Sequence, residues 1–219
     1  MDALQGLIDV DTDIFLSINR MHTTFWDYFM SAYSGKGIWV PMYAALLYVM
    51  LRNFSWKVTL MCAIGVALTI TFADQVCATF IRPYVERMRP SNLNNPLSEM
   101  VHIVNNHRGG RYGFPSCHAA NTFGLAFYIF FVFRQKWLTV YMMAWAFLTC
   151  YSRIYLGVHY PGDLLAGTIV GAIGAYLMYR LFMMVSKYKR PKQVKHANTP
   201  IMIGVWTIVG MLVYAVISC

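Results

Sequence analysis

Charged side chains are scarce in this sequence, and acidic ones are the scarcest. Asp, Glu, Lys and Arg make up 12% of the 219 residues, whereas apolar residues make up 58%. Soluble domains carry roughly a quarter of their residues as charged groups, so a water-soluble globular domain is excluded. The 9 acidic residues stand against 18 Lys and Arg, a net charge of +9. Because a mean hydropathy of +0.47 leaves little polar surface, we expect no nucleic-acid partner.

The sequence also lacks the patterns typical of disulfide-rich, metal-binding and secreted proteins. Its five cysteines are odd in number and not closely spaced, which favours free thiols. No cluster of His, Asp and Glu has the spacing of metal ligands, so we expect no metal and no other cofactor. The first residues are acidic, at Asp2, Asp9, Asp11 and Asp13, the opposite of the basic start of a signal peptide. We therefore expect no cleavage.

Long apolar stretches without charge are what the sequence has in abundance. Apolar residues occupy every face of these stretches, as expected of helices that cross a membrane. The sequence therefore predicts an all-α integral membrane bundle of six transmembrane helices in one domain over 36–219. Several stretches are shorter than the roughly 20 residues that a span needs, so flanking basic residues snorkel or the helices end in a polar site. The six stretches are 37–51, 58–73, 114–133, 137–152, 164–179 and 197–219.

The first 35 residues have a different pattern. Apolar residues recur at helical spacing between Leu4 and Ile18, whereas Asp9, Asp11 and Asp13 fall largely on the other side. We predict an N-terminal interfacial amphipathic segment over 1–35 that lies on the membrane and anchors the bundle.

The loops indicate how the bundle is oriented. The loops after the first, third and fifth apolar stretches carry basic residues and no acid, so by the positive-inside tendency they face the cytoplasm. The N-terminus, the 82–113 loop, the 153–163 loop and the C-terminus then share the opposite face. The basic residues are Arg52, Lys57, Arg134, Lys136, Lys187, Lys189, Arg190, Lys192 and Lys195.

Three polar clusters lie on that opposite face, at 82–90, 115–118 and 152–163. Arg82, Arg89 and Arg153 offer forked, permanently charged donors suited to phosphoryl oxygens. Ser116 is a good N-cap for a helix that begins at Cys117, so the backbone N–H groups of this helix start also favour an anion.

Two histidines complete the clusters. Pro161 suits the first turn of a helix, which puts Asp163 in that turn and His159 just before it. A carboxylate bonded to one ring nitrogen fixes the tautomer and leaves the other nitrogen as a nucleophile. We therefore expect His159 to be the nucleophile and His118 the general acid.

The clusters resemble the signature of the type 2 phosphatidic acid phosphatase family, membrane enzymes that dephosphorylate lipid phosphates and diphosphates. The family pattern is Lys, six residues, Arg-Pro; then Pro-Ser-Gly-His; then Ser-Arg, five residues, His, three residues, Asp. This chain keeps every spacing, but Arg82 replaces the Lys and Cys117 replaces the Gly. Arg82 preserves the charge in a larger, planar group, and the Cys117 side chain narrows the approach.

The resemblance implies that His159 attacks phosphorus, that Asp163 orients it and that His118 protonates the leaving oxygen. Water then hydrolyses a phosphohistidine. The active-site loops are 82–118 and 152–163, and the implied phosphate-binding residues are Arg82, Arg89, Ser116, Cys117 and Arg153.

The expected function is hydrolysis of a lipid phosphate in a bacterial inner membrane, with the site facing the periplasm or cell exterior. Lipid phosphate is the expected substrate and membrane lipids the surrounding partners. Within the 91–113 loop, the basic stretch 102–111, with His102, His107, Arg108 and Arg111, favours the sugar-phosphate head group of lipid A. Undecaprenyl diphosphate and glycerophospholipid phosphates are alternatives, as is a protein that binds or transports a phosphate lipid. Asp74 is expected either to reach the site or to form an interhelical hydrogen bond.

Overall fold

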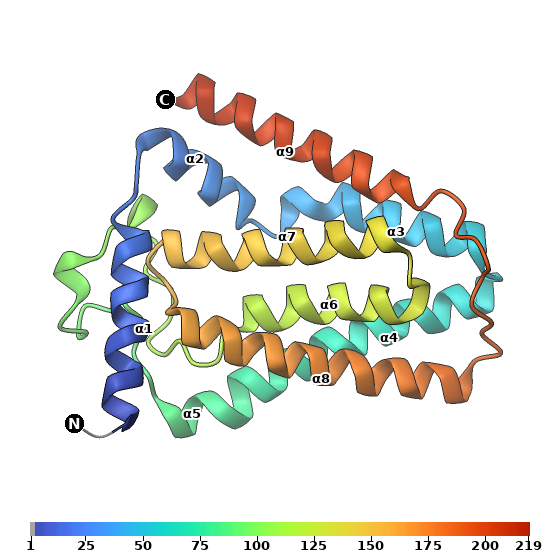
Figure 1. Cartoon of the computed structure of the whole chain (residues 1–219), viewed down its shortest axis with the longest axis horizontal. Coiled ribbons are helices and arrows are strands. Elements are labelled where there is room, and N and C mark those ends of the chain that lie inside the picture. Colours follow the sequence, from blue (N-terminus) through green and yellow to red (C-terminus); the bar gives the residue numbers. More distant parts are fainter. Residues whose placement is uncertain (1–2) are drawn as a thin grey trace.

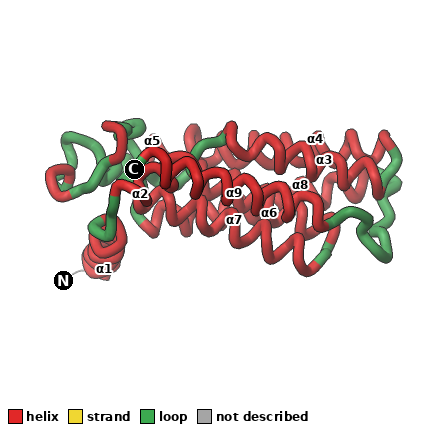
Figure 2. The backbone as a smooth tube through the Cα atoms, turned by 90° about the horizontal axis from the view of Figure 1, so that it is seen from above, coloured by secondary structure: helices red, strands yellow, loops and turns green. Residues whose placement is uncertain are grey.

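A computed structural model describes residues 3–219 as helices joined by loops (Figure 2). No strand is present in this part of the chain, where the only β-type contact is an isolated antiparallel bridge between Met88 and Tyr112. The prediction of an all-helical protein is confirmed.

Six long helices run along the long axis of the molecule (Figure 1). Three segments are long and apolar enough to cross a membrane: Trp56–Val85, Pro161–Val185 and Asn198–Ser218. The six helices are α3 (Val40–Asn53), α4 (Trp56–Gln75), α6 (Cys117–Phe133), α7 (Lys136–Tyr155), α8 (Pro161–Val185) and α9 (Asn198–Ser218).

The helix α4 does not stop where its apolar stretch ends. It passes through a π-helical segment, η2 (Val76–Ile81), into the short α5 (Arg82–Val85), which brings Arg82 to the end of the bundle. Glu86 then has a positive φ of 49° and turns the chain into the 86–116 loop. This loop contains two short 3-10 helices, η3 (Ser98–Met100) and η4 (Val104–Asn106).

Small residues let α8 lie close against α6. A Cβ added at Gly167 would lie 2.3 Å from the Ser116 carbonyl oxygen, and one at Gly171 would lie 2.3 Å from that of Ala120. Glycine at these positions lets the two backbones approach, as is common between membrane helices. The start of α6 is thereby held against the first turns of α8.

The N-terminal region forms two helices, α1 (Ala3–Asn19) and α2 (Thr24–Tyr33). Thr23 caps α2 by accepting a hydrogen bond from the Trp26 N–H (3.3 Å). Figure 1 shows α1 lying across the end of the bundle, and Figure 2 views it nearly end-on. The three acids of α1, expected largely opposite its apolar residues, do not share one environment: Asp9 and Asp13 are exposed, whereas Asp11 pairs with Arg87 at the bundle's end.

Candidate active site

The three polar clusters of the sequence meet at one end of the bundle. They lie at the end of α5, the start of α6, the end of α7 and the start of α8, at the same end as α1 (Figure 1). A backbone hydrogen bond from the Ser116 N–H to the Asp163 carbonyl (2.9 Å) joins the second cluster to the third. The first cluster is held to the end of the 86–116 loop by the Arg89 N–H, which donates to the Arg111 carbonyl beside the isolated bridge (3.2 Å).

His159 and Asp163 form a buried pair, with 1% and 0% of their surfaces exposed. Pro161 begins α8, and this puts Asp163 in its first turn, where Oδ2 accepts from the Tyr160 N–H (3.1 Å) and lies 3.2 Å from His159 Nδ1. The backbone of Gly113 covers the pair, because a Cβ there would lie 2.9 Å from Asp163 Oδ2.

The contact between Arg89 and His159 fixes the protonation of the ring. Arg89 Nη1 lies 2.8 Å from His159 Nε2, and a guanidinium can only donate, so Nε2 carries the lone pair and Nδ1 carries the proton. Burial, and then the charges of Arg89 and Arg153, hold the pKa of His159 well below its usual range. The imidazole is therefore neutral at physiological pH, with its nucleophilic lone pair directed at a cation.

Each of the three predicted arginines has an unsatisfied donor. The Nε atoms of Arg82, Arg89 and Arg153 are buried and have no hydrogen-bond partner among residues 3–219. Burial, and then the nearby Arg82, lower the pKa of Arg89 to about 10, which leaves it charged at neutral pH. Three cations whose Nε–H groups are buried and free call for an anion between them.

The remaining donors of the arginines hold the site together. Arg82 Nη2 donates to the Pro115 carbonyl (2.9 Å) and to Cys117 Sγ (3.2 Å). Arg89 Nη1 also donates to the Val158 carbonyl (3.0 Å), and Arg153 donates to the Ser34 hydroxyl.

The start of α6 has the cap that the sequence predicts. Ser116 is its N-cap, and the Ser116 hydroxyl accepts from the Ala119 N–H (3.5 Å). The first N–H groups of a helix have no intrahelical partner and favour an anion. Cys117 and His118 stand in this first turn, and Cys117 presents its thiol to Arg82.

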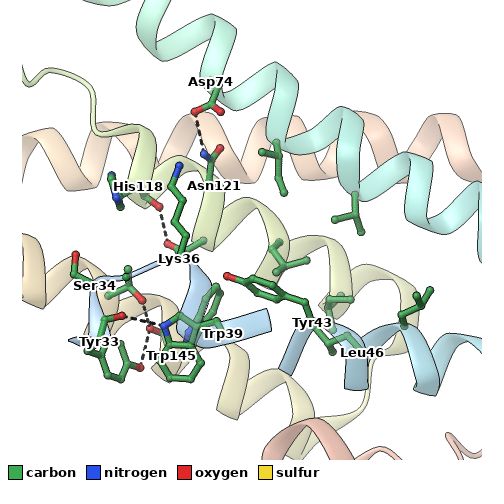
Figure 3. Close-up of a pocket in the computed structure, with 18 of the residues that line it drawn as sticks. Tyr33, Ser34, Lys36, Trp39, Tyr43, Leu46, Asp74, His118, Asn121 and Trp145 are labelled. Carbon is green, nitrogen blue, oxygen red and sulfur yellow. Dashed lines mark hydrogen bonds between the residues drawn. The ribbon is translucent and has the colours of Figure 1, made fainter. Parts of the chain in front are cut away.

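His118 lines a cavity of about 460 Å³ that runs from the polar end into the bundle. Figure 3 shows its ring near the tip of Lys36, with the hydrogen-bonded pair of Asp74 and Asn121 above them (2.9 Å). The rest of the lining is mostly apolar and comes from α3, α4, α6 and α7, including Tyr43, Leu46, Met50, Val66, Ile70 and Leu125. Of the two expectations for Asp74, the interhelical hydrogen bond is confirmed, and the residue also borders this cavity.

The residues of the 91–113 loop divide into two groups. His102 bonds Asp27 through Nε2 (2.9 Å) and stacks on His22, and Arg108 donates to the Ser91 carbonyl (2.9 Å). These two side chains hold the loop in place, whereas His107 and Arg111 are exposed. Only the second group is free to meet a large head group.

Four residues at the site were not predicted: Asp11, Ser34, Lys36 and Arg87. Ser34 and Lys36 follow α2, at the boundary between the 1–35 segment interpreted as an anchor and the 36–219 domain. Arg87 stands inside the first cluster without a role in the family pattern. Their one sequence signal is charge or polarity at the end of an apolar stretch, which does not say where the side chain points.

Comparison with known proteins places this geometry in a family. Residues 56–187, which contain all three clusters, match the PAP2 superfamily. The chain is similar to a lipid A 4'-phosphatase of Bacteroides thetaiotaomicron, with 48% identity over 98% of this chain and 99% of the relative. It is also similar to a lipid A 4'-phosphatase of Porphyromonas gingivalis, with 32% identity over 82% of this chain and 76% of the relative.

A solved structure has the same fold. The crystal structure of Aquifex aeolicus LpxE superimposes with a TM-score of 0.57 and 20% identity, covering 77% of this chain and 94% of that chain. The family resemblance read from the three clusters is confirmed: this membrane protein belongs to the PAP2 superfamily.

Proposed function

We propose that this protein is a lipid A phosphatase that removes the 4'-phosphate. The observation that carries the proposal is the 48% identity, over nearly the whole of both chains, to a lipid A 4'-phosphatase. The free Nε–H groups of the three arginines, the neutral His159 and its carboxylate partner supply the groups that phosphoryl transfer needs.

In the proposed first step, the phosphate lies between Arg82, Arg89 and Arg153, whose free Nε–H groups bind its oxygens. Arg89 moves its Nη1 contact from His159 to the phosphate, which frees the lone pair on Nε2. This nitrogen attacks phosphorus, and the bond from phosphorus to the sugar oxygen breaks. His118, protonated once the negative phosphate lies beside it, gives that proton to the sugar oxygen. Asp163 stabilises the charge that forms on the imidazole.

In the proposed second step, His118 takes a proton from water. The water oxygen attacks the phosphohistidine, the N–P bond breaks, and inorganic phosphate leaves with His159 neutral again. Throughout, the arginines and the Ser116–Cys117 backbone at the start of α6 stabilise the charge on the equatorial oxygens.

The cavity beside His118 suits the lipid part of the substrate. Its polar end holds Lys36 and its deeper wall is apolar, so a phosphate at His118 would leave an acyl chain against α3 and α4. Lys36 would then meet a second anionic group of the head group.

We place the protein in a bacterial inner membrane, where α3, α4, α6, α7, α8 and α9 are six spans of the 36–219 domain. The end that carries the basic loops faces the cytoplasm and the active site faces the periplasm. Residues 1–35 form the interfacial segment, with the exposed apolar side chains Leu4, Leu7, Val10 and Ile14 on α1 against the lipid head groups.

Phosphate release from purified protein tests the proposal. The protein in detergent, with EDTA present, is given lipid A, undecaprenyl diphosphate, phosphatidylglycerophosphate and phosphatidate. We expect fastest release from lipid A, with a product that has lost its 4'-phosphate and kept its 1-phosphate.

The control variants separate catalysis from folding. His159→Ala should lose activity by at least about 10³-fold because the nucleophile is gone. His196→Ala, an exposed histidine at the other end of the bundle, should keep it. Faster release from undecaprenyl diphosphate would replace the substrate assignment, and binding of lipid A without release would favour a carrier.

A further inference from the structure

Asp163 has a second oxygen that the His159 contact does not use. Its Oδ1 accepts a hydrogen bond from Arg87 Nη1 (3.1 Å). Arg87 lies in the first cluster but is not one of the residues that match the family pattern. Arg87 Nη2 in turn pairs with Asp11 Oδ2 on α1 (2.7 Å). A side chain of the N-terminal helix is thus linked to the nucleophile through Arg87 and Asp163.

Asp11 also binds the same helix turn directly. Its Oδ1 accepts from the Gly162 N–H (2.7 Å), one of the N–H groups at the start of α8 that lack an intrahelical partner. Asp11 therefore holds Asp163 from two sides, through the Arg87 side chain and through the backbone of the preceding residue. The Asp11 carboxylate lies close against the backbone of Gly162, because a Cβ added at Gly162 would lie 2.9 Å from Asp11 Oδ2.

The guanidinium between the two carboxylates has little freedom. Arg87 lies over the Tyr160 ring, 3.9 Å from its centroid, and Tyr160 packs edge-on against Phe15 of α1 (5.2 Å). Asn95 donates to the Tyr160 hydroxyl (3.0 Å) and fixes the ring from the other side. Such a stacked, bidentate arginine is a specific connector that lysine does not reproduce.

Charge balance gives Asp11 a chemical effect as well as a mechanical one. With both carboxylates present, Arg87 shares its positive charge between Asp11 and Asp163. Without Asp11 the whole charge of Arg87 faces Asp163, which weakens that carboxylate as a partner for the imidazolium that forms on His159.

We propose that Asp11 and Arg87 are positioning residues of the reaction, which orient Asp163 against His159 from the N-terminal helix. The proposal rests on the proposed phosphohistidine mechanism for the roles of His159 and Asp163. It gives α1 a part in turnover beyond anchoring.

The test compares acidic residues on one helix. Asp11→Asn removes the charge that pairs with Arg87, and Asp13→Asn removes an exposed charge two residues away. Both are assayed on lipid A and on para-nitrophenyl phosphate, a soluble monoester. We expect Asp11→Asn to lower kcat about tenfold with KM changed less than about twofold, as for other residues that orient a reacting group. Asp13→Asn should stay within about twofold of the parent.

Three further results distinguish positioning from a merely structural role. Asp11→Glu keeps the carboxylate and should recover most of kcat. In an Arg87→Gln background, Asp11→Asn should have little further effect, because an amide oxygen at position 11 can still accept from the Gly162 N–H and only the ion pair with Arg87 is lost. The thermal midpoints of Asp11→Asn and Asp13→Asn should be similar.

Contrary outcomes are equally specific. Fully additive effects of the two substitutions, or a normal kcat in a less stable Asp11→Asn protein, would overturn the positioning role. If the parent cleaves the soluble ester but not lipid A, the substrate assignment fails while Asp11 is still tested on the soluble ester. A parent that cleaves neither would remove the reaction, and the positioning role with it.

Discussion

At the scale of single residues, His159 is one group through which pH acts on the fold. It is buried, its pKa is well below the usual range, and Arg89 points a charge at it. Below its unfolded pKa of about 6.5, the unfolded chain binds a proton at this position that the folded protein does not. The free energy of unfolding therefore falls as pH falls below about 6.5, by up to about 1.4 kcal/mol per pH unit from this residue.

Thermal unfolding in detergent between pH 5 and pH 8 measures this effect. The parent should lose stability towards pH 5 more steeply than His159→Gln, which has no titrating ring. Parallel curves for the two proteins would contradict a neutral, buried His159.

Much of the candidate site can be predicted from sequence because its key spacings are local. Pro161 and Asp163 belong to one helix start. Asp163 is therefore three residues from the Tyr160 N–H and four from His159, which brings its carboxylate to the imidazole. The pair of Asp11 and Arg87 has no such signal. The two residues are 76 positions apart, so no local spacing joins them.

At the scale of elements, the contact between α6 and α8 couples packing to the site. Gly167→Ala would put a methyl group 2.3 Å from the Ser116 carbonyl oxygen and 3.0 Å from the Ala119 Cβ. The start of α6 must then move away from α8. We expect a loss of about 1–3 kcal/mol in stability, with lower kcat because Ser116 caps the helix that bears His118.

A glycine on another helix provides a control variant, whose thermal midpoint and kcat are compared with those of Gly167→Ala. Gly210 of α9 has nothing within 4 Å of an added Cβ. Gly210→Ala should therefore leave kcat unchanged and leave stability equal or up to about 1 kcal/mol higher, from helix propensity alone. An equal response of both variants would show that the close approach at Gly167 does not matter.

Helix positions follow from hydropathy better than helix ends do. Each of the six apolar stretches coincides with a long helix, since a continuous apolar run has few other ways to satisfy its backbone. The continuation of α4 through a π-helical segment to Val85 is not predictable, because Arg82 and Pro83 look like a stop. The break between α1 and α2 depends on the Thr23 cap, a short-range signal inside a longer amphipathic pattern.

At the scale of the whole molecule, the two ends of the bundle differ in charge and in chemistry. The loops with Arg134, Lys136 and the 187–195 run lie at the end opposite the site (Figure 1). A cysteine at exposed Leu93 should therefore react with a membrane-impermeant maleimide in intact spheroplasts, whereas one at exposed Gln193 should react only after lysis.

The background for this experiment carries Cys219→Ser, because Cys219 is an exposed thiol. This background without an added cysteine sets the baseline. Labelling of the Gln193→Cys protein in intact spheroplasts, with none at Leu93→Cys, would invert the proposed orientation.

The cavity beside His118 has one more consequence, for how the rate should be expressed. Leu47 of α3 lines it and is 44% exposed, as a sideways opening towards the lipid layer would require. A substrate that enters by this route diffuses in two dimensions and need not leave the bilayer. Turnover then depends on the mole fraction of substrate in the micelle or membrane, so adding inert detergent dilutes the reaction even when the total amount of lipid A per volume stays constant.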